Sequence, residues 1–155
     1  MKAVIAALAL SVAAAGAVQA QTGQWTPSSV NDNFIRGVNL STVRARGNVR
    51  AFDAVSVYRE RRDFAGHSVD YMLMHFEIDC AANTVRTINL HGYLADGSSV
   101  FSSKLNGDPE PIVEGSMSDG EKDTVCDEPS SEVRYPSVQE FFRWGRASGI
   151  ATWNG

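Results

Sequence analysis

Two neighbouring segments of the chain alternate apolar and polar residues with a period of two, and this pattern constrains the fold more than any other. The first runs from about Ser68 to Cys80 and the second from about Thr84 to Ala95. The short loop between them contains Asn83, which tolerates the positive φ of a hairpin turn. Because successive residues of a strand point to opposite faces, an alternation that agrees across two segments predicts a half-buried antiparallel hairpin.

The two faces of this predicted hairpin differ in polarity. The apolar face comprises Met72, Met74, Phe76, Ile78 and Cys80, then Arg86, Ile88, Leu90, Gly92 and Leu94. The polar face comprises Tyr71, His75, Glu77 and Asp79, then Thr87, Asn89, His91 and Tyr93. In this register His91 lies opposite Leu73 and His75 lies opposite Asn89, which makes the two imidazoles diagonal neighbours.

Turn signals extend the sheet on both sides of this hairpin. The Asp-Gly pair at 96–97 predicts a second hairpin, so that residues 68–105 form a three-stranded meander. Weaker alternation predicts a strand over residues 34–44 and another around residues 55–58. The charged residues 59–67 are interpreted as a connecting loop.

Two capping boxes predict short helices late in the chain. Ser118 with Glu121 favours a helix over residues 119–126, and Ser137 with Glu140 favours a second one after Pro136. Strands followed by helices are typical of the α+β class. We therefore expect an antiparallel β-sheet meander with one or two short helices packed on it.

The N-terminus matches a secretory signal peptide. Lys2 precedes an apolar run to about Val18, and small or apolar residues stand at positions −3 and −1 of a cleavage site after Ala20. The run is shorter than the roughly 20 apolar residues of a membrane span, and no cysteine near the site offers a lipid anchor. We expect residues 1–20 to be removed and the exported chain to have neither a transmembrane nor a lipid anchor.

The remaining chain divides into three parts on the same grounds. Residues 21–33 are polar and are interpreted as an extended arm. Residues 34–126 form the β-rich domain, and residues 127–155 form a C-terminal extension with a short helix. Without Lys2 the chain has 13 basic and 18 acidic residues, a net charge of −5, which argues against a nucleic-acid partner.

The exported chain has two cysteines, Cys80 and Cys126. Two cysteines in an oxidising compartment favour one disulfide, and two free thiols are the alternative. The spacing contains no C-x-x-C, which argues against a thiol-redox enzyme. No G-x-S-x-G, P-loop or G-x-G-x-x-G signature is present either, so the sequence predicts no enzyme and no cofactor.

The polar face of the hairpin is the one place where a metal site is conceivable. His75 and His91 with a neighbouring carboxylate could bind zinc, although no H-E-x-x-H motif supports this. The alternative is an ordinary solvent-facing sheet surface. We expect no metal and name His75 and His91 as the residues to examine.

Several short motifs resemble those of the surface-adhesin protein E family of exported proteobacterial domains. The shared pattern is a strand that ends in E-I-D-C, a basic residue followed by Y-x-x-x-G, then P-I-x-x-G-S and a helix that ends in V-C. These motifs correspond here to Glu77–Cys80, Arg86, Tyr93 with Gly97, Pro111–Ser116, and Val125 with Cys126. The resemblance covers about Val49 to Cys126.

This resemblance implies an antiparallel sheet with a packed helix and a disulfide between Cys80 and Cys126. For a few members it implies adhesion to host extracellular-matrix and serum proteins, and it supplies no catalytic residue. The leading hypothesis is an exported, non-enzymatic binding domain with a protein partner, in the periplasm or at the surface of a Gram-negative bacterium. The alternatives are a soluble periplasmic accessory protein and a small metal-dependent enzyme that uses His75 and His91.

Overall fold

A computed structural model of the chain describes residues 22–129 and 131–149. The expected signal peptide, with its cleavage site after Ala20, lies outside the described residues. None of the helices within them is both long and apolar enough to cross a membrane.

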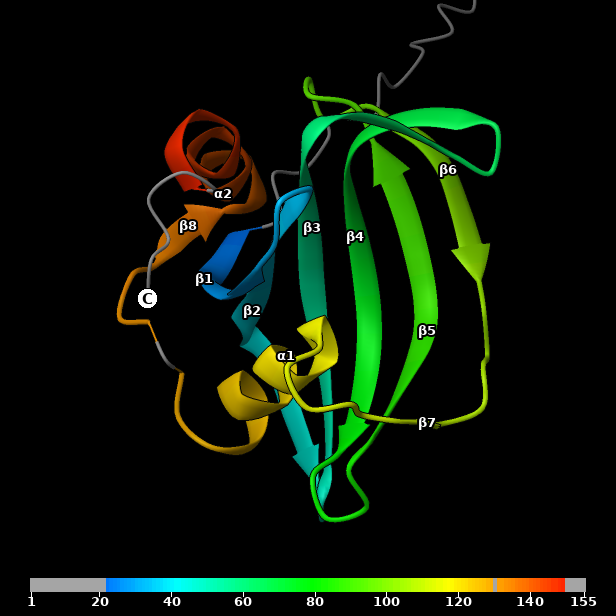
Figure 1. Cartoon of the computed structure of the whole chain (residues 1–155), viewed down its shortest axis with the longest axis vertical. Coiled ribbons are helices and arrows are strands. Elements are labelled where there is room, and N and C mark those ends of the chain that lie inside the picture. Colours follow the sequence, from blue (N-terminus) through cyan, green and yellow to red (C-terminus); the bar gives the residue numbers. More distant parts are fainter. Residues whose placement is uncertain (1–21, 130, 150–155) are drawn as a thin grey trace, which may run out of the picture.

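One antiparallel sheet of eight strands forms the body of the protein (Figure 1). The strands follow one another in space in the order β6-β5-β4-β3-β2-β1-β8, so the first six form a simple meander, and β7 pairs with the start of β5. Their bounds are β1 Thr22–Val30, β2 Phe34–Arg46, β3 Val49–Phe64, β4 His67–Asp79, β5 Thr84–Tyr93, β6 Ser99–Lys104, β7 Glu110–Pro111 and β8 Tyr135–Ser137. The α-helices are α1 Met117–Cys126 and α2 Val138–Trp144, and a π-helical turn, η1 Gly145–Gly149, follows α2. The expected fold class is confirmed.

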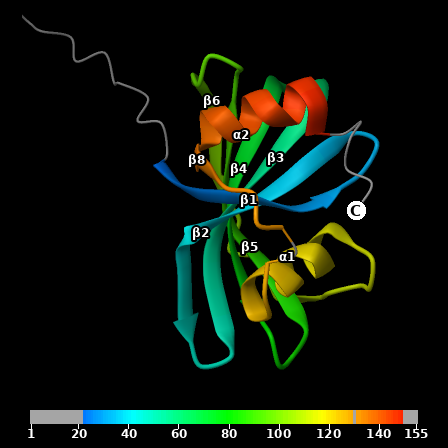
Figure 2. The ribbon, with the colours of Figure 1, turned by 90° about the vertical axis from the view of Figure 1, so that its left-hand side faces the viewer.

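Alternation along the strands gives the sheet two buried faces, each with its own helix. The face that packs against α1, here the α1 face, buries Val38, Phe52, Ala54, Val69, Met72, Met74, Phe76, Ile78, Leu90, Ile112 and Val125. The opposite α2 face buries Trp25, Ile35, Val55, Val57, Tyr71, Leu73, Val138, Phe141 and Phe142. Figure 2 shows the two helices well apart, with the twisted sheet running between them.

The predicted hairpin is formed by β4 and β5, but its register changes part-way. His91 pairs with Leu73 and His75 pairs with Asn89, as the alternation predicts. Beyond this point the pairing shifts by one residue, so Arg86 lies opposite Glu77. The prediction that Arg86 belongs to the apolar face is therefore wrong, because a bulge adds one residue to β5 and reverses the alternation after it.

A second correction concerns residues 59–67, for which the charged sequence predicts a loop. β3 continues to Phe64, and a tight turn with positive φ at Ala65 and Gly66 leads into β4. The side chains of this part are charged and solvent-exposed, so no apolar alternation indicates the strand. Residues 62–64 pair instead with residues 67–69 of β4. Asp70, buried near the start of β4, adds an ion pair with Arg61 on β3 (2.9 Å).

The two helix starts differ in how well the capping pattern predicts them. Ser137 caps α2, and its hydroxyl accepts a hydrogen bond from the Glu140 amide (3.2 Å) as predicted. For α1 the predicted box of Ser118 and Glu121 is wrong, because Ser116 is the cap and α1 begins two residues earlier than expected. Glu121 points inward instead of back to the helix start.

Glu121 and Arg36 form a buried ion pair that holds α1 on the sheet. The Glu121 side chain is fully buried, and its Oε1 lies 2.7 Å from Nη1 of Arg36 on β2. Burial raises the pKa of Glu121, and the Arg36 charge opposes that rise. The Arg36 guanidinium also lies over the ring of Phe76, 5.6 Å from its centroid. Pairing of this kind is what makes a buried charge tolerable.

A disulfide between Cys80 and Cys126 joins the end of β4 to the end of α1. No described cysteine is free. α1 is thus held at one end by a covalent bond and near its middle by the Arg36–Glu121 pair.

The two segments that flank the predicted β-rich domain both contribute to the fold. Residues 22–30, within the expected arm, form β1, and Trp25 on this strand is completely buried. Within the expected extension, β8 pairs with β1 and α2 packs on the α2 face through Phe141 and Phe142. Both segments therefore belong to the same sheet and core as residues 34–126.

Candidate functional site

α2 covers only one part of the α2 face. Tyr71 and Leu73, at the covered end of β4, are 1% and 5% exposed, whereas His75, Glu77 and Asp79 further along the same strand are half-buried. The same transition occurs on the neighbouring strands. The uncovered part, here called the open face, consists of Asp53 on β3, His75, Glu77 and Asp79 on β4, and Arg86, Asn89 and His91 on β5.

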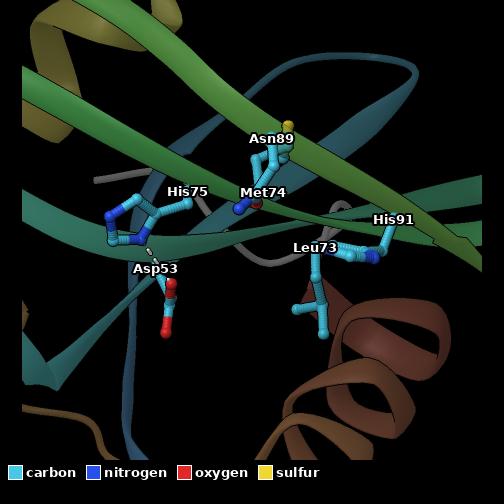
Figure 3. Close-up of a pocket in the computed structure, with 6 residues that line it drawn as sticks. All are labelled: Asp53, Leu73, Met74, His75, Asn89 and His91. Atoms are coloured by element: carbon cyan, nitrogen blue, oxygen red, sulfur yellow. Dashed lines mark hydrogen bonds and ion pairs between the residues drawn. The ribbon is translucent and has the colours of Figure 1, made fainter. Parts of the chain in front are cut away.

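A shallow pocket of about 150 Å³ lies at the boundary between the covered and open parts. It is lined by Asp53, Leu73, Met74, His75, Asn89 and His91. Figure 3 shows Asp53 and His75 together at one end and His91 at the other end, beside Leu73. The structure thus brings His75 and His91 to one pocket, but their rings do not converge on a common point.

His75 is paired with a carboxylate that the sequence analysis did not single out. Its Nδ1 lies 2.8 Å from Oδ1 of Asp53, and each side chain is 34% exposed. The pair follows from register, since Asp53 and His75 are directly opposite on β3 and β4. When Nδ1–H donates to the carboxylate of Asp53, Nε2 of the neutral ring is left as an acceptor for a ligand.

The open face continues into a second shallow pocket near the ends of the strands. Val49, Glu77, Asp79, Thr84, Arg86 and Pro109 line it. Nε of Arg86 donates to Oε2 of Glu77 at 2.7 Å, and the Asp79 carboxylate accepts two backbone amides of the following turn. Arg86 thus neutralises Glu77, whereas Asp79 is held by backbone amides and keeps its charge, so this part of the surface offers hydrogen bonds together with one net negative charge.

The geometry of the described residues does not favour a metal centre here. No group of three His, Cys, Asp or Glu side chains among them is arranged to hold a metal ion. One ring nitrogen of His75 is occupied by Asp53, and His91 lies apart from this pair. The arrangement is that of a polar, half-buried sheet surface.

The model of one protein family, described as surface-adhesin protein E, matches residues 25–127. The chain belongs to this family. The match extends from β1 to just beyond α1, and so includes both cysteines and every residue of the open face. No curated protein and no solved structure was found to match the chain.

Membership of the surface-adhesin protein E family supports an adhesin-like, non-enzymatic protein. It also separates two parts of this structure. The strands that carry the open face lie within the matched region, whereas β8, α2 and η1 lie beyond it. The helix that covers the other part of the same face thus lies outside the matched region.

Of the residues that define the site, Asp53 was missed for an identifiable reason. It stands between apolar neighbours, 22 residues before His75 in a long hairpin, and only the register of β3 against β4 places the two side chains together. The buried pair of Arg36 and Glu121 was missed for the same reason, since 85 residues separate its members.

Proposed function

We propose that this protein is an exported, non-enzymatic binding domain that recognises a protein partner through the open face, in the cell envelope or at the cell surface. The observation that supports this most directly is the position of the open face within the region matched by the adhesin family. A face that combines polar side chains, a small apolar floor at Leu73 and an ion pair suits contact with another protein, because protein interfaces away from their core are polar and form many hydrogen bonds.

A pull-down from an envelope extract tests the proposal. The bait is the chain from residue 21 to residue 155, as wild type and as Asn89→Arg, which places a long charged side chain in the first pocket. The matched control is Ser99→Arg, which adds the same charge to an exposed position on β6. We expect a partner that wild type and the Ser99 variant capture equally and that the Asn89 variant loses. Equal capture by all three proteins contradicts the role of the open face.

Fractionation decides between adhesion and the periplasmic accessory role. We expect a share of the protein to be reached by an added protease on intact cells. Complete protection on intact cells, with full release in the soluble periplasmic fraction, instead supports the accessory role.

The metal-enzyme alternative has its own test. Elemental analysis of purified protein is expected to find no stoichiometric metal, and a chelator is expected to leave the unfolding curve unchanged. One bound zinc that is lost in a variant with His75→Ala and His91→Ala would replace the binding-domain proposal with the metal site.

A further inference from the structure

The tip of the β2–β3 hairpin carries three arginines on a chain whose overall charge is negative. Arg44 and Arg46 lie at the end of β2, and Arg50 lies at the start of β3, with a turn at Gly47 between them. Figure 2 shows this hairpin at the lower end of the molecule, directed away from α2. Residues 44–48 are all solvent-exposed.

None of these arginines is neutralised by a carboxylate of the described chain. The ion pairs that arginines form there involve Arg36, Arg61, Arg86 and Arg146. Nη1 of Arg44 instead donates to two carbonyl oxygens of the hairpin, both at 3.0 Å, and Nη1 of Arg50 does the same at 2.8 and 3.3 Å. Two guanidinium groups are thus held in place, with their remaining N–H donors available to a ligand.

The strand register places these charges around one edge. Arg44 and Arg46 lie opposite Ala51 and Val49, on the α2 face, while Arg50 lies opposite Ala45 on the other face. The outer edge of β2 is unpaired here, because β1 pairs only with residues 35–39 of β2. A ligand that follows this edge therefore meets guanidinium groups on both sides and backbone N–H groups between them.

We propose that the tip of the β2–β3 hairpin binds an anionic polysaccharide that carries sulfate or phosphate groups. The guanidinium fork matches the oxygen atoms of these groups. The exposed tip offers Arg44, Ala45, Arg46, Gly47 and Asn48, with no aromatic or large aliphatic side chain. Protein partners are anchored by such side chains, whereas a polyanion needs only the charges. This second site adjoins the open face, because Val49 opposite Arg46 lines the second pocket, but it uses none of the residues that define the open face.

Titration of the chain from residue 21 to residue 155 with heparin tests the sulfated source, and titration with a phosphorylated lipopolysaccharide core oligosaccharide tests the phosphorylated source. The test variant combines Arg44→Gln, Arg46→Gln and Arg50→Gln. The control variant combines Arg59→Gln, Arg62→Gln and Lys104→Gln, which removes three exposed charges elsewhere. Desulfated heparin is the ligand control.

We expect wild type and the control variant to bind at least one of the two charged ligands. The tip variant should bind the same ligand about tenfold more weakly, because it lacks three exposed charge contacts. Binding should weaken as salt is added. No binding of either ligand by wild type at low salt overturns the proposal, and so does an equal loss in both variants. The arginines could alternatively serve to protect the open edge from pairing. In that case the tip variant aggregates while polysaccharide affinity is unchanged, which also overturns the proposal.

Discussion

Replacing Asp70 with Asn should weaken the fold in a way that depends on pH. Asp70 is 2% exposed, and Nη2 of Arg61 on β3 donates to its Oδ2 (2.9 Å) while Nη2 of Arg146 on η1 donates to its Oδ1. The Ala95 amide also donates to Oδ2 (2.8 Å). One buried carboxylate thereby joins the extended end of β3, the loop after β5 and the turn that follows α2.

The magnitude follows from the pKa of this carboxyl group. Burial alone would raise it, but the hydrogen bonds from Arg61, Arg146 and Ala95 outweigh burial and lower the pKa of Asp70 from 3.8 to about 2. Each pKa unit corresponds to about 1.4 kcal/mol of differential stabilisation. The ionised group therefore contributes roughly 2 to 3 kcal/mol to the free energy of unfolding at neutral pH.

The sign of the pH dependence is fixed by the direction of this shift. A carboxyl group whose pKa is lower in the folded state stabilises the fold at pH values above its unfolded pKa. Its contribution is complete above about pH 4 and disappears as the pH falls to about 2. The stability difference between wild type and Asp70→Asn should shrink over the same interval.

Urea unfolding followed by tryptophan fluorescence at pH 7, 4, 3 and 2.5 measures this difference. Asp32→Asn is the matched control, because Asp32 is exposed and outside this network. We expect Asp70→Asn to lose about 2 kcal/mol at pH 7 and progressively less below pH 4. A loss within error of the control, or one that stays constant down to pH 2.5, would refute the reasoning.

Three further perturbations test the packing. Cys80 and Cys126 are 46 residues apart, so reduction of their disulfide should lower the free energy of unfolding by about 4 kcal/mol on the chain-entropy estimate. Urea unfolding with and without reductant measures this loss, and an unchanged midpoint contradicts it. Gly37→Ala places a Cβ 2.4 Å from the ring of buried Phe141, so the ring or α2 must shift. A loss of about 1 to 3 kcal/mol is expected in thermal unfolding, whereas a neutral result would show that this contact yields at little cost. Ser137→Ala removes the α2 cap and should cost about 1 kcal/mol, with Ser137→Asn as the variant that restores it.

The apolar alternation predicted the centre of the sheet well because burial on one side repeats every second residue. It placed Met72, Met74 and Phe76 on the core side, and all three are buried. It failed where the pattern contains an inserted residue, as in the bulge of β5 between Thr87 and Asn89, since a period of two carries no information about bulges. It also failed for β1, whose polar sequence hides the fully buried Trp25.

The site could be predicted only in outline. The face that carries His75 and His91 follows from the hairpin alone, but the contact between His75 and Asp53 depends on how β3 pairs with β4. Likewise, the late position of α2 in the chain says nothing about which sheet face it covers. Because α2 covers Tyr71 and Leu73, the polar face of the prediction is in fact divided into a buried part and an open part.

The most direct test of the binding proposal is photo-crosslinking in living cells. A photoreactive amino acid is introduced in place of Asn89, in the pocket of the open face, and in a second strain in place of Ser99 on β6. The proposal predicts a discrete crosslinked adduct with another protein from position 89 and none from position 99. No adduct at position 89, or the same adduct from both positions, would contradict the claim that this adhesin-family protein binds its partner through the open face.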